Sequence, residues 1–365
     1  MFKQESLEEL RRRIDLVDLL SSYVDLKRAG AYYKACCPFH DEKSPSFVVQ
    51  KGDSHYHCFG CGAHGDAIAF LMSHLKLSFS DAVENLAERF HVHLDTVEGR
   101  VKDAGPSKQE MRGIMQEAAE FYHGYLLHTD EGHAALEYLY KRGIDLDFVR
   151  LFNIGFAPRL PQIFHQVVTD KKWDGNLLQT LGLLTQKQSP FFSDRILFPI
   201  TDSIGNTIAF SGRKMREETF GPKYINSPES PLFKKSQTLY GLAQSRKRIA
   251  KERKVIIVEG QIDALRLIQE GFNFTVAGQG TAFGADQASQ LIKLGAHTVY
   301  LLLDGDQAGR AAAVKIGNLF QKEGVAVMVA KMPANTDPDT LLNEKGAPAI
   351  VELMETSLDY LAFYY

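Results

Sequence analysis

The chain has 365 residues, of which 44% are hydrophobic and 24% charged, and its formal net charge is −3. This composition is typical of a soluble chain long enough for two or three domains. No apolar stretch approaches the roughly 20 residues of a membrane span. The first residues, MFKQESLEELRRR, mix acidic and basic side chains and do not resemble a secretory signal. We therefore expect a cytoplasmic protein that has no membrane partner.

The charged residues are unevenly distributed along the chain. Residues 195–254 contain 13 Lys and Arg against 5 Asp and Glu. Further along, acidic residues concentrate at the ends of predicted strands. A local basic excess favours a partner that carries phosphate groups, such as a nucleic acid.

Residues 1–94 form the first predicted domain, which holds all four cysteines and two helical patterns. Asp66 precedes AIAFLMSHL as a predicted helix N-cap. Ser78 with Asp81 resembles a capping box that opens FSDAVENLAERF. Residues 95–110 are poor in large apolar side chains and contain Gly-Pro-Ser, which indicates an interdomain linker.

The rest of the chain changes character twice. Residues 111–253 begin rich in helical patterns and then mix short strands with Gly, Pro and Asn turns, which predicts an α+β subdomain. From residue 254 the apolar strands KVIIV, FTVA, VYLLL and VAVMVA alternate with helical stretches. This alternation is the signature of a parallel α/β sheet, which we place at 254–335. Residues 336–365 are predicted to form a C-terminal helical segment.

The cysteines occur with a spacing typical of a metal site. Cys37 and His40 are separated by two residues, as are Cys58 and Cys61, and 17 residues lie between the two pairs. Two such knuckles can close a tetrahedron around one Zn²⁺, and four protein ligands leave no open position, so this zinc is predicted to be structural. Buried thiols without a metal are the alternative. Cys36 is predicted to be a small buried hydrophobic residue and no ligand.

Aromatic and basic residues alternate around these knuckles. A basic surface with stacking rings suits single-stranded nucleic acid, but aromatic residues of a small ribbon equally often form its core. The sequence leaves both alternatives open for Tyr32, Tyr33, Lys34, Lys43, Phe47, Lys51, Tyr56 and Phe59.

The basic middle of the chain contains cations next to predicted turns and strand ends. Such residues can bind phosphate groups, and Arg offers bidentate geometry. A solvated basic face is the alternative for any single one of them. The residues are Arg195, Arg213, Lys223, Lys234 and Lys235.

Six carboxylates follow strands of the predicted parallel sheet, where the carboxyl ends of the strands form the ligand-binding edge. One of them alone, such as Asp306 or Asp339, could be a helix cap or a turn former. Capping does not account for all six together. Mg²⁺ does, because it binds a few carboxylates and keeps waters for substrate phosphates. The six are Glu259, Asp263, Asp304, Asp306, Asp337 and Asp339.

Taken together, the chain resembles the bacterial replicative DNA primases over nearly its whole length. The resemblance is carried by CPFH…CFGCGAHGD, IGFAP, RILFPI, KYINSPES, LYGL, VEGQIDA, DGDQAGR and DPDT, in that order. It implies a zinc-ribbon domain that helps to read the template and a polymerase domain with a Toprim-type catalytic sheet. The fold class is thus multidomain α/β, beginning with a small zinc ribbon and ending in helices.

The resemblance also assigns roles to individual residues. Glu259, Asp304 and Asp306 correspond to the catalytic metal site, which takes Mg²⁺ or Mn²⁺. Asp263, Asp337 and Asp339 support that site. A basic strip that binds nucleotides and template corresponds to Arg195, Arg213, Lys223, Asn226 and Lys235.

The activity implied by the resemblance is synthesis of short RNA primers by metal-dependent nucleotidyl transfer. The implied partners are single-stranded DNA template, ribonucleoside triphosphates, the RNA–DNA hybrid and a replicative helicase. The place of action would be the replication fork in the bacterial cytoplasm. The family's C-terminal helicase-binding domain is absent from this chain, which we interpret as truncation. Two alternatives remain open, namely a Toprim topoisomerase or nuclease, and a non-enzymatic zinc-ribbon nucleic-acid binder.

Three positions depart from the pattern of the family. Ser211 precedes Gly212 where the family usually has two glycines before the arginine. Gln261 replaces a common aromatic residue after the acidic-glycine pair. Leu151 stands where a basic residue is frequent, with Arg150 one position earlier, so we assign no role there.

Overall fold

The computed structural model describes residues 2–40, 42, 44–75, 77, 79–95, 106–279 and 283–365. The predicted capping residue Ser78, the basic residue Lys43 and most of the predicted linker 95–110 lie outside these residues. The chain divides into two compact units, Met1–Gly105 and Pro106–Tyr365. No helix in the described part of the chain is long and apolar enough to cross a membrane.

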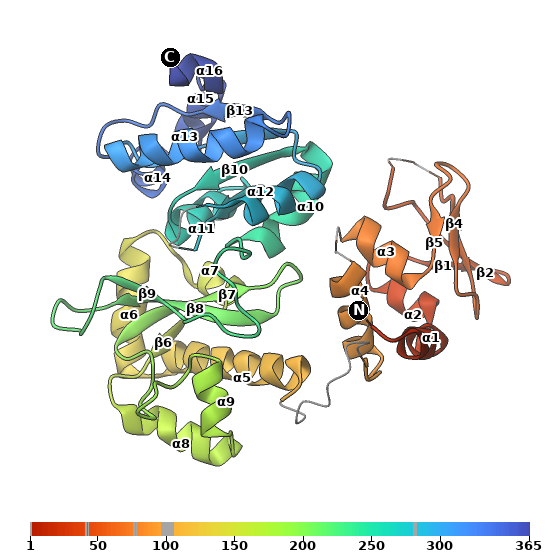
Figure 1. Cartoon of the computed structure of the whole chain (residues 1–365), viewed down its shortest axis with the longest axis horizontal. Coiled ribbons are helices and arrows are strands. Elements are labelled where there is room, and N and C mark those ends of the chain that lie inside the picture. Colours follow the sequence, from red (N-terminus) through yellow and green to blue (C-terminus); the bar gives the residue numbers. More distant parts are fainter. Residues whose placement is uncertain are drawn as a thin grey trace. The chain divides into compact units, whose positions relative to one another are not determined.

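The first unit is a small antiparallel sheet with helices (Figure 1). Its five strands pair in sequence order, β1-β2-β3-β4-β5. The predicted N-cap is confirmed, because the Asp66 side chain accepts a hydrogen bond from the Ala69 amide at the start of α3. The elements are α1 (Gln4–Arg13), α2 (Leu16–Ser21), β1 (Lys27–Ala29), β2 (Tyr32–Ala35), β3 (Phe47–Gln50), β4 (Tyr56–Cys58), β5 (His64–Gly65), α3 (Ala67–His74) and α4 (Phe79–Arg89).

The structure divides the aromatic residues around the knuckles into two groups. Phe47 and Tyr56 are buried, with ring centroids 4.9 Å apart, and both lie against Phe70 of α3. These rings form the core of the ribbon. Tyr32 and Phe59 are 47% and 75% exposed, so only such residues are available for stacking on a ligand.

The second unit begins with helices that pack on a four-stranded antiparallel sheet of order β6-β7-β8-β9. Strands β7 and β8 are almost entirely buried. Side chains of β7 belong to two hydrophobic clusters, since Ile196 lies in one and Leu197 in the other. The elements are α5 (Lys108–His128), α6 (Asp130–Lys141), α7 (Leu146–Leu151), β6 (Gly155–Ala157), α8 (Pro161–Lys171), α9 (Gly175–Thr180), β7 (Arg195–Thr201), β8 (Thr207–Lys214), β9 (Tyr224–Asn226) and α10 (Leu242–Glu252).

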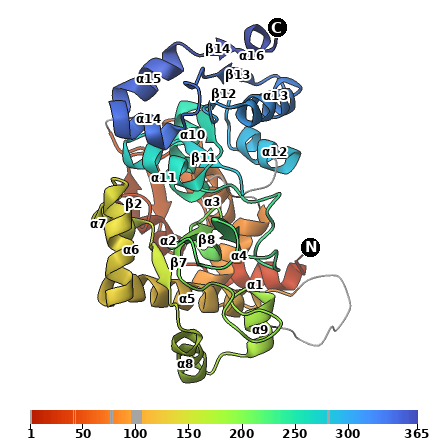
Figure 2. The same ribbon diagram turned by 90° about the vertical axis from the view of Figure 1, so that its left-hand side faces the viewer.

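The four strands predicted from residue 254 onward all form, and they pair in parallel in the order β11-β10-β12-β13. A two-residue strand, β14, adds an antiparallel edge that the sequence did not predict. Helices α12 and α13 lie on one side of this sheet, and α11 and α14 lie on the other (Figure 2). The elements are β10 (Lys254–Val258), α11 (Gln261–Gln269), β11 (Thr275–Ala277), α12 (Ala285–Lys293), β12 (Thr298–Leu301), α13 (Gln307–Gln321), β13 (Ala326–Val329), α14 (Pro338–Lys345), α15 (Ala347–Glu355), β14 (Leu358–Asp359) and α16 (Tyr360–Tyr364).

The parallel register brings the carboxyl ends of the strands to one edge. Ile257 of β10 lies opposite Leu301 of β12, which in turn lies opposite Val329 of β13. Two glycines allow close packing there. A Cβ atom on Gly309 would lie 2.1 Å from the Asp304 carbonyl oxygen, and one on Gly305 would lie 1.9 Å from that of Pro333. The glycines of DGDQAG are therefore required by the close approach of the loop and of α13.

Candidate functional site

The four predicted zinc ligands meet in the first unit. The donor atoms of Cys37, His40, Cys58 and Cys61 lie within 4.8 Å of one another. The Cys37 and Cys61 Sγ atoms are 3.8 Å apart, and Cys58 Sγ is 3.9 Å from His40 Nδ1. Cys36 is exposed and lies outside this group. Three thiols and one imidazole at these separations fit one tetrahedral zinc ion. The expectation that Cys36 is buried was wrong.

Sequence reasoning missed Glu42, whose carboxylate holds the first knuckle together. It accepts hydrogen bonds from the amide of Cys37 at 2.7 Å and from the amide of Ser46 at 3.1 Å. It also lies 3.3 Å from His40 Nε2. Because Nε2 faces a carboxylate, Nδ1 is the nitrogen left to bind a metal, an arrangement common in zinc proteins. The position of Glu42, two residues after His40, was the signal in the sequence that could have indicated this role.

The carboxylates form a second group, at the carboxyl edge of the parallel sheet. We call Glu259, Asp263, Asp304, Asp306 and Asp337 the acidic edge. The Asp304 amide donates to Glu259 Oε1 at 3.2 Å, which joins the ends of β10 and β12. The Oδ1 atom of Asp304 is buried and has no hydrogen-bond partner in the described structure. Partial burial raises the pKa of Asp304 to about 6, and the nearby negative charges of Glu259, Asp337 and Asp306 add to the rise.

Two members of the acidic edge are helix caps. Asp306 Oδ1 accepts from the Gly309 amide at 2.7 Å and begins α13. Asp337 Oδ1 accepts from the Thr340 amide at 2.7 Å and begins α14. Asp304 caps no helix. The capping alternative is therefore correct for Asp306, whose second carboxylate oxygen stays available to a ligand.

Asp263 and Asp339 are the buried members of the predicted set. Burial raises the pKa of Asp263 to about 7, and the charges of Asp337 and Asp304 raise it further. Asp339 is 4% exposed, and its carboxylate pairs with Arg266 at 3.2 Å and Arg142 at 3.0 Å. Two cations already compensate this charge. Direct metal binding by Asp339 stays a prediction that this arrangement does not support.

The partners of Asp339 were missed by sequence reasoning. Arg142 and Arg266 lie 197 and 73 residues away from it along the chain. Arg266 is itself buried and also donates to the carbonyl oxygen of Gly143 at 2.7 Å. These contacts connect α14 with α11 and with the end of α6. No local pattern reports a pairing across such separations.

The structure places Arg195 differently from its predicted position on a binding surface. The residue is 2% exposed. Its guanidinium donates to the carbonyl oxygens of Gly212, Phe220 and Pro222 at 3.1, 2.7 and 3.1 Å. Arg195 thus fixes the connection between β8 and β9. Its contact with nucleotide or template stays a prediction that the burial of the side chain does not support.

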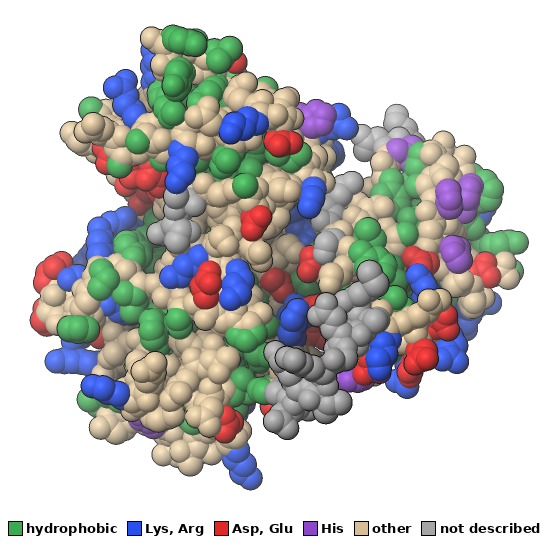
Figure 3. All heavy atoms as spheres, in the orientation of Figure 1, with side chains coloured by type: hydrophobic (Ala, Val, Ile, Leu, Met, Phe, Trp, Pro, Cys, Tyr) green, Lys and Arg blue, Asp and Glu red, His purple; other side chains and the backbone are tan. Residues whose placement is uncertain are grey.

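Other residues of the predicted basic strip lie on or next to β8 and β9. Arg213 on β8 is partly exposed, and Lys223, just before β9, is exposed. Asn226 donates to the carbonyl oxygen of Gln279 at 3.1 Å and lies 3.5 Å from Gln261, which takes the place of the family's aromatic residue. The backbone of Lys235 is fixed by Glu229 and Gln287. Figure 3 shows acidic side chains gathered near α14, with basic side chains directly below them.

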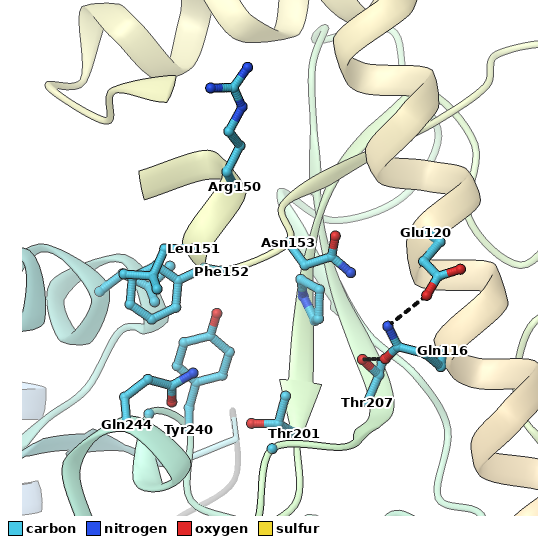
Figure 4. Close-up of a pocket in the computed structure, with 14 residues that line it drawn as sticks. Gln116, Glu120, Arg150, Leu151, Phe152, Asn153, Thr201, Thr207, Tyr240 and Gln244 are labelled. Carbon is cyan, nitrogen blue, oxygen red and sulfur yellow. Dashed lines mark hydrogen bonds between the residues drawn. The ribbon is translucent and has the colours of Figure 1, made fainter. Parts of the chain in front are cut away.

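A separate cavity of about 380 Å³ lies between α5, α7, α10 and β7 (Figure 4). Its polar wall includes Gln116, which hydrogen-bonds Glu120 at 3.1 Å and Thr207 at 3.4 Å. The hydroxyl of Tyr240 points into it. None of the residues that line it belongs to the acidic edge, to the predicted zinc ligands or to the predicted basic strip.

Known protein families match this chain along most of its length. Residues 2–102 match the CHC2 zinc finger family, 121–246 the N-terminal domain of the DNA primase catalytic core, and 256–342 a Toprim-like family. The crystal structure of the Aquifex aeolicus primase, comprising its zinc-binding and RNA polymerase domains, is 36% identical. The match covers 97% of this chain and 86% of that one, with a TM-score of 0.64. This chain belongs to the bacterial DNA primase family.

Two other primases extend the comparison. The Chlamydia pneumoniae DNA primase is 48% identical over 368 residues, which cover 100% of this chain and 62% of that protein. The chain therefore spans somewhat over three fifths of that relative. The RNA polymerase domain of the Mycobacterium tuberculosis primase, solved with double-stranded DNA, is 31% identical. That match covers 70% of this chain and 83% of the other, with a TM-score of 0.65.

The family matches agree with the residues singled out from the sequence. The zinc finger match contains all four predicted zinc ligands, and the Toprim-like match contains the whole acidic edge. The resemblance to bacterial primases and the predicted fold class are thereby confirmed. The primase matches assign no role to individual residues, so the catalytic and binding roles given above remain predictions.

Proposed function

We propose that this primase-family chain synthesises short RNA primers on a single-stranded DNA template. The observation that carries the proposal is the unpartnered, buried Asp304 oxygen among like-charged carboxylates at the end of a Toprim-like sheet. Such a group of negative charges is costly unless a cation compensates it. Hard carboxylate oxygens are the ligands that Mg²⁺ and Mn²⁺ prefer.

The donor set fits a divalent cation held by Glu259, Asp304 and Asp306, with Asp263 and Asp337 next to them. When bound, Mg²⁺ or Mn²⁺ supplies positive charge that stabilises the transferring phosphoryl group. In the reaction, a ribonucleotide 3′-hydroxyl attacks the α-phosphate of a ribonucleoside triphosphate, and pyrophosphate leaves. Glu259 is also a candidate general acid or base for the hydroxyl proton, since its carboxylate lies at the same edge.

The remaining residues bind the substrates. Arg213, Lys223, Asn226 and Lys235 hold nucleotide phosphates and the backbone of the template and RNA–DNA hybrid, which predicts a salt-sensitive affinity. Arg195 contributes by fixing the β8–β9 connection. One structural zinc holds the ribbon in residues 1–94, which contacts template. The predicted linker 95–110 ends earlier than expected, because α5 begins at Lys108. Residues 111–253 act as the basic subdomain, 254–335 as the catalytic sheet and 336–365 as the closing helices.

The whole enzyme would act in the bacterial cytoplasm at the replication fork, together with a replicative helicase. The test is incubation of the zinc-loaded chain with single-stranded DNA, labelled ribonucleoside triphosphates and Mg²⁺. We expect short RNA that depends on template and metal. Plasmid relaxation without RNA synthesis would instead indicate a Toprim topoisomerase, and DNA binding alone would indicate a non-enzymatic binder.

A further inference from the structure

An aromatic residue of α6 lies against two arginines, one on strand β8 and one at the C-terminal end of α6 itself. The Arg213 Cζ atom lies 4.0 Å from the centre of the Tyr138 ring. The Arg142 Cζ atom lies 5.7 Å from the same ring centre. Both distances are within the range in which a guanidinium is attracted to the face of an aromatic ring. Tyr138 belongs to none of the motifs that identify the family.

The first arginine needs a group that fixes its orientation. Arg213 Nη1 donates to the carbonyl oxygen of the adjacent Lys214 at 3.0 Å, which is a local contact. Its Nε atom is buried without a hydrogen-bond partner in the described structure. Tyr224 lies directly opposite Arg213 in the register of β8 and β9. Tyr224 is thus a neighbour of Arg213 within the hairpin, and the Tyr138 ring contacts the guanidinium from outside it.

The second arginine connects the same ring to the catalytic sheet. Arg142 donates to Asp339 Oδ2 at 3.0 Å, and the Asp339 amide donates to Asp263 Oδ1 at 3.0 Å. Asp263 belongs to the acidic edge. A continuous series of contacts thus runs from Arg213 through Tyr138, Arg142 and Asp339 to the acidic edge.

We propose that Tyr138 is a positioning residue that holds the Arg213 guanidinium, through its ring face, in register with the acidic edge. The inference rests on the proposed function, because it takes the phosphates of DNA or of a nucleotide as the target of Arg213. A side chain held in its bound orientation loses less conformational freedom on binding. Removing the ring should therefore weaken phosphate binding although Tyr138 touches no substrate.

The test is a double-mutant cycle on binding of single-stranded DNA and of ribonucleoside triphosphate, read by fluorescence anisotropy and by KM. Tyr138→Leu should weaken binding about 2- to 30-fold, the range of a cation–π contact, with a smaller change in kcat. On the Arg213→Ala background the same change should have no further effect. Tyr140→Leu is the matched control, because Tyr140 lies on the same helix and is 47% exposed.

Two further variants separate positioning from packing. Tyr138→Phe keeps the ring and should bind as the wild type does. Pentafluorophenylalanine at position 138 keeps the shape but reverses the charge distribution of the ring face, so it should reproduce the loss of affinity while thermal stability stays close to that of Tyr138→Phe. This pair also serves if the leucine variant unfolds.

Several results would overturn the proposal. These are equal effects of Tyr138→Leu with and without Arg213, unchanged affinity in the pentafluorophenylalanine variant, or unchanged affinity in Arg213→Ala. Failure of the proposed function looks different, since the wild type would then bind DNA without making RNA, and the binding cycle would still give its answer.

Discussion

Replacing Asp304 with asparagine removes one negative charge from the acidic edge and keeps the size of the side chain. If the carboxylate is present to bind a divalent cation, the metal-free protein gains stability while catalysis is lost. Asp304 caps no helix, and its Oδ1 atom is buried without a partner. No structural hydrogen bond of that atom is lost in the exchange.

The size of the gain follows from the pKa of the group. A rise from 3.8 to about 6 corresponds to about 3 kcal/mol at most. Because the carboxyl group is only half-buried, solvent screening reduces this, and we expect about 1 kcal/mol at pH 8. For a unit of this size, that corresponds to a rise in Tm of about 2–4 °C. Primer synthesis should fall by at least about 10²-fold, since charge on the phosphoryl group is no longer compensated.

The assay compares thermal unfolding with and without Mg²⁺, and primer synthesis, for the wild type and Asp304→Asn. Asp306→Ala is the matched comparison, because it also removes a charge but deletes the cap of α13, which costs about 1 kcal/mol. Near wild-type primer synthesis by Asp304→Asn would refute the reasoning. So would a metal-free protein that is clearly destabilised by this change.

The other predictions concern zinc, the linker and pH. Cys36→Ala should retain one zinc per chain by elemental analysis, whereas Cys37→Ala should lose it, and the reverse would refute the assignment. Glu42→Gln should weaken zinc binding about 10- to 100-fold in competition with a chelator, and unchanged affinity would contradict the role of its contact with the histidine. Limited proteolysis should cut first within 96–105 and leave two stable fragments, so earlier cleavage inside either unit would argue against independent domains. Burial raises the pKa of Asp263 to about 7. The metal-free wild type should therefore lose stability relative to Asp263→Asn as pH rises from about 4 to 7. A stability difference between the two proteins that is constant over that interval would contradict this.

Local sequence patterns were sufficient where the chemistry depends on neighbours in the chain. Two-residue spacers brought the candidate zinc ligands of each knuckle together, because a short turn fixes the distance between residues so close in sequence. Apolar runs ending in carboxylates located the acidic edge, because parallel strands end at the same edge of a sheet. The sequence by itself thus determined the domain order, the group of candidate zinc ligands and the position of the acidic edge.

Only the tertiary structure decided what each charged side chain faces. Arg195 and Asp339 look like binding residues in the sequence, yet one holds a loop and the other pairs with two arginines. Tyr138 and Arg213 meet from separate elements, 75 positions apart in the numbering. In the sequence, a charged residue looks the same whether its side chain contacts solvent, substrate or another side chain. Burial and contacts between distant residues distinguish these roles, and both arise only when the chain folds.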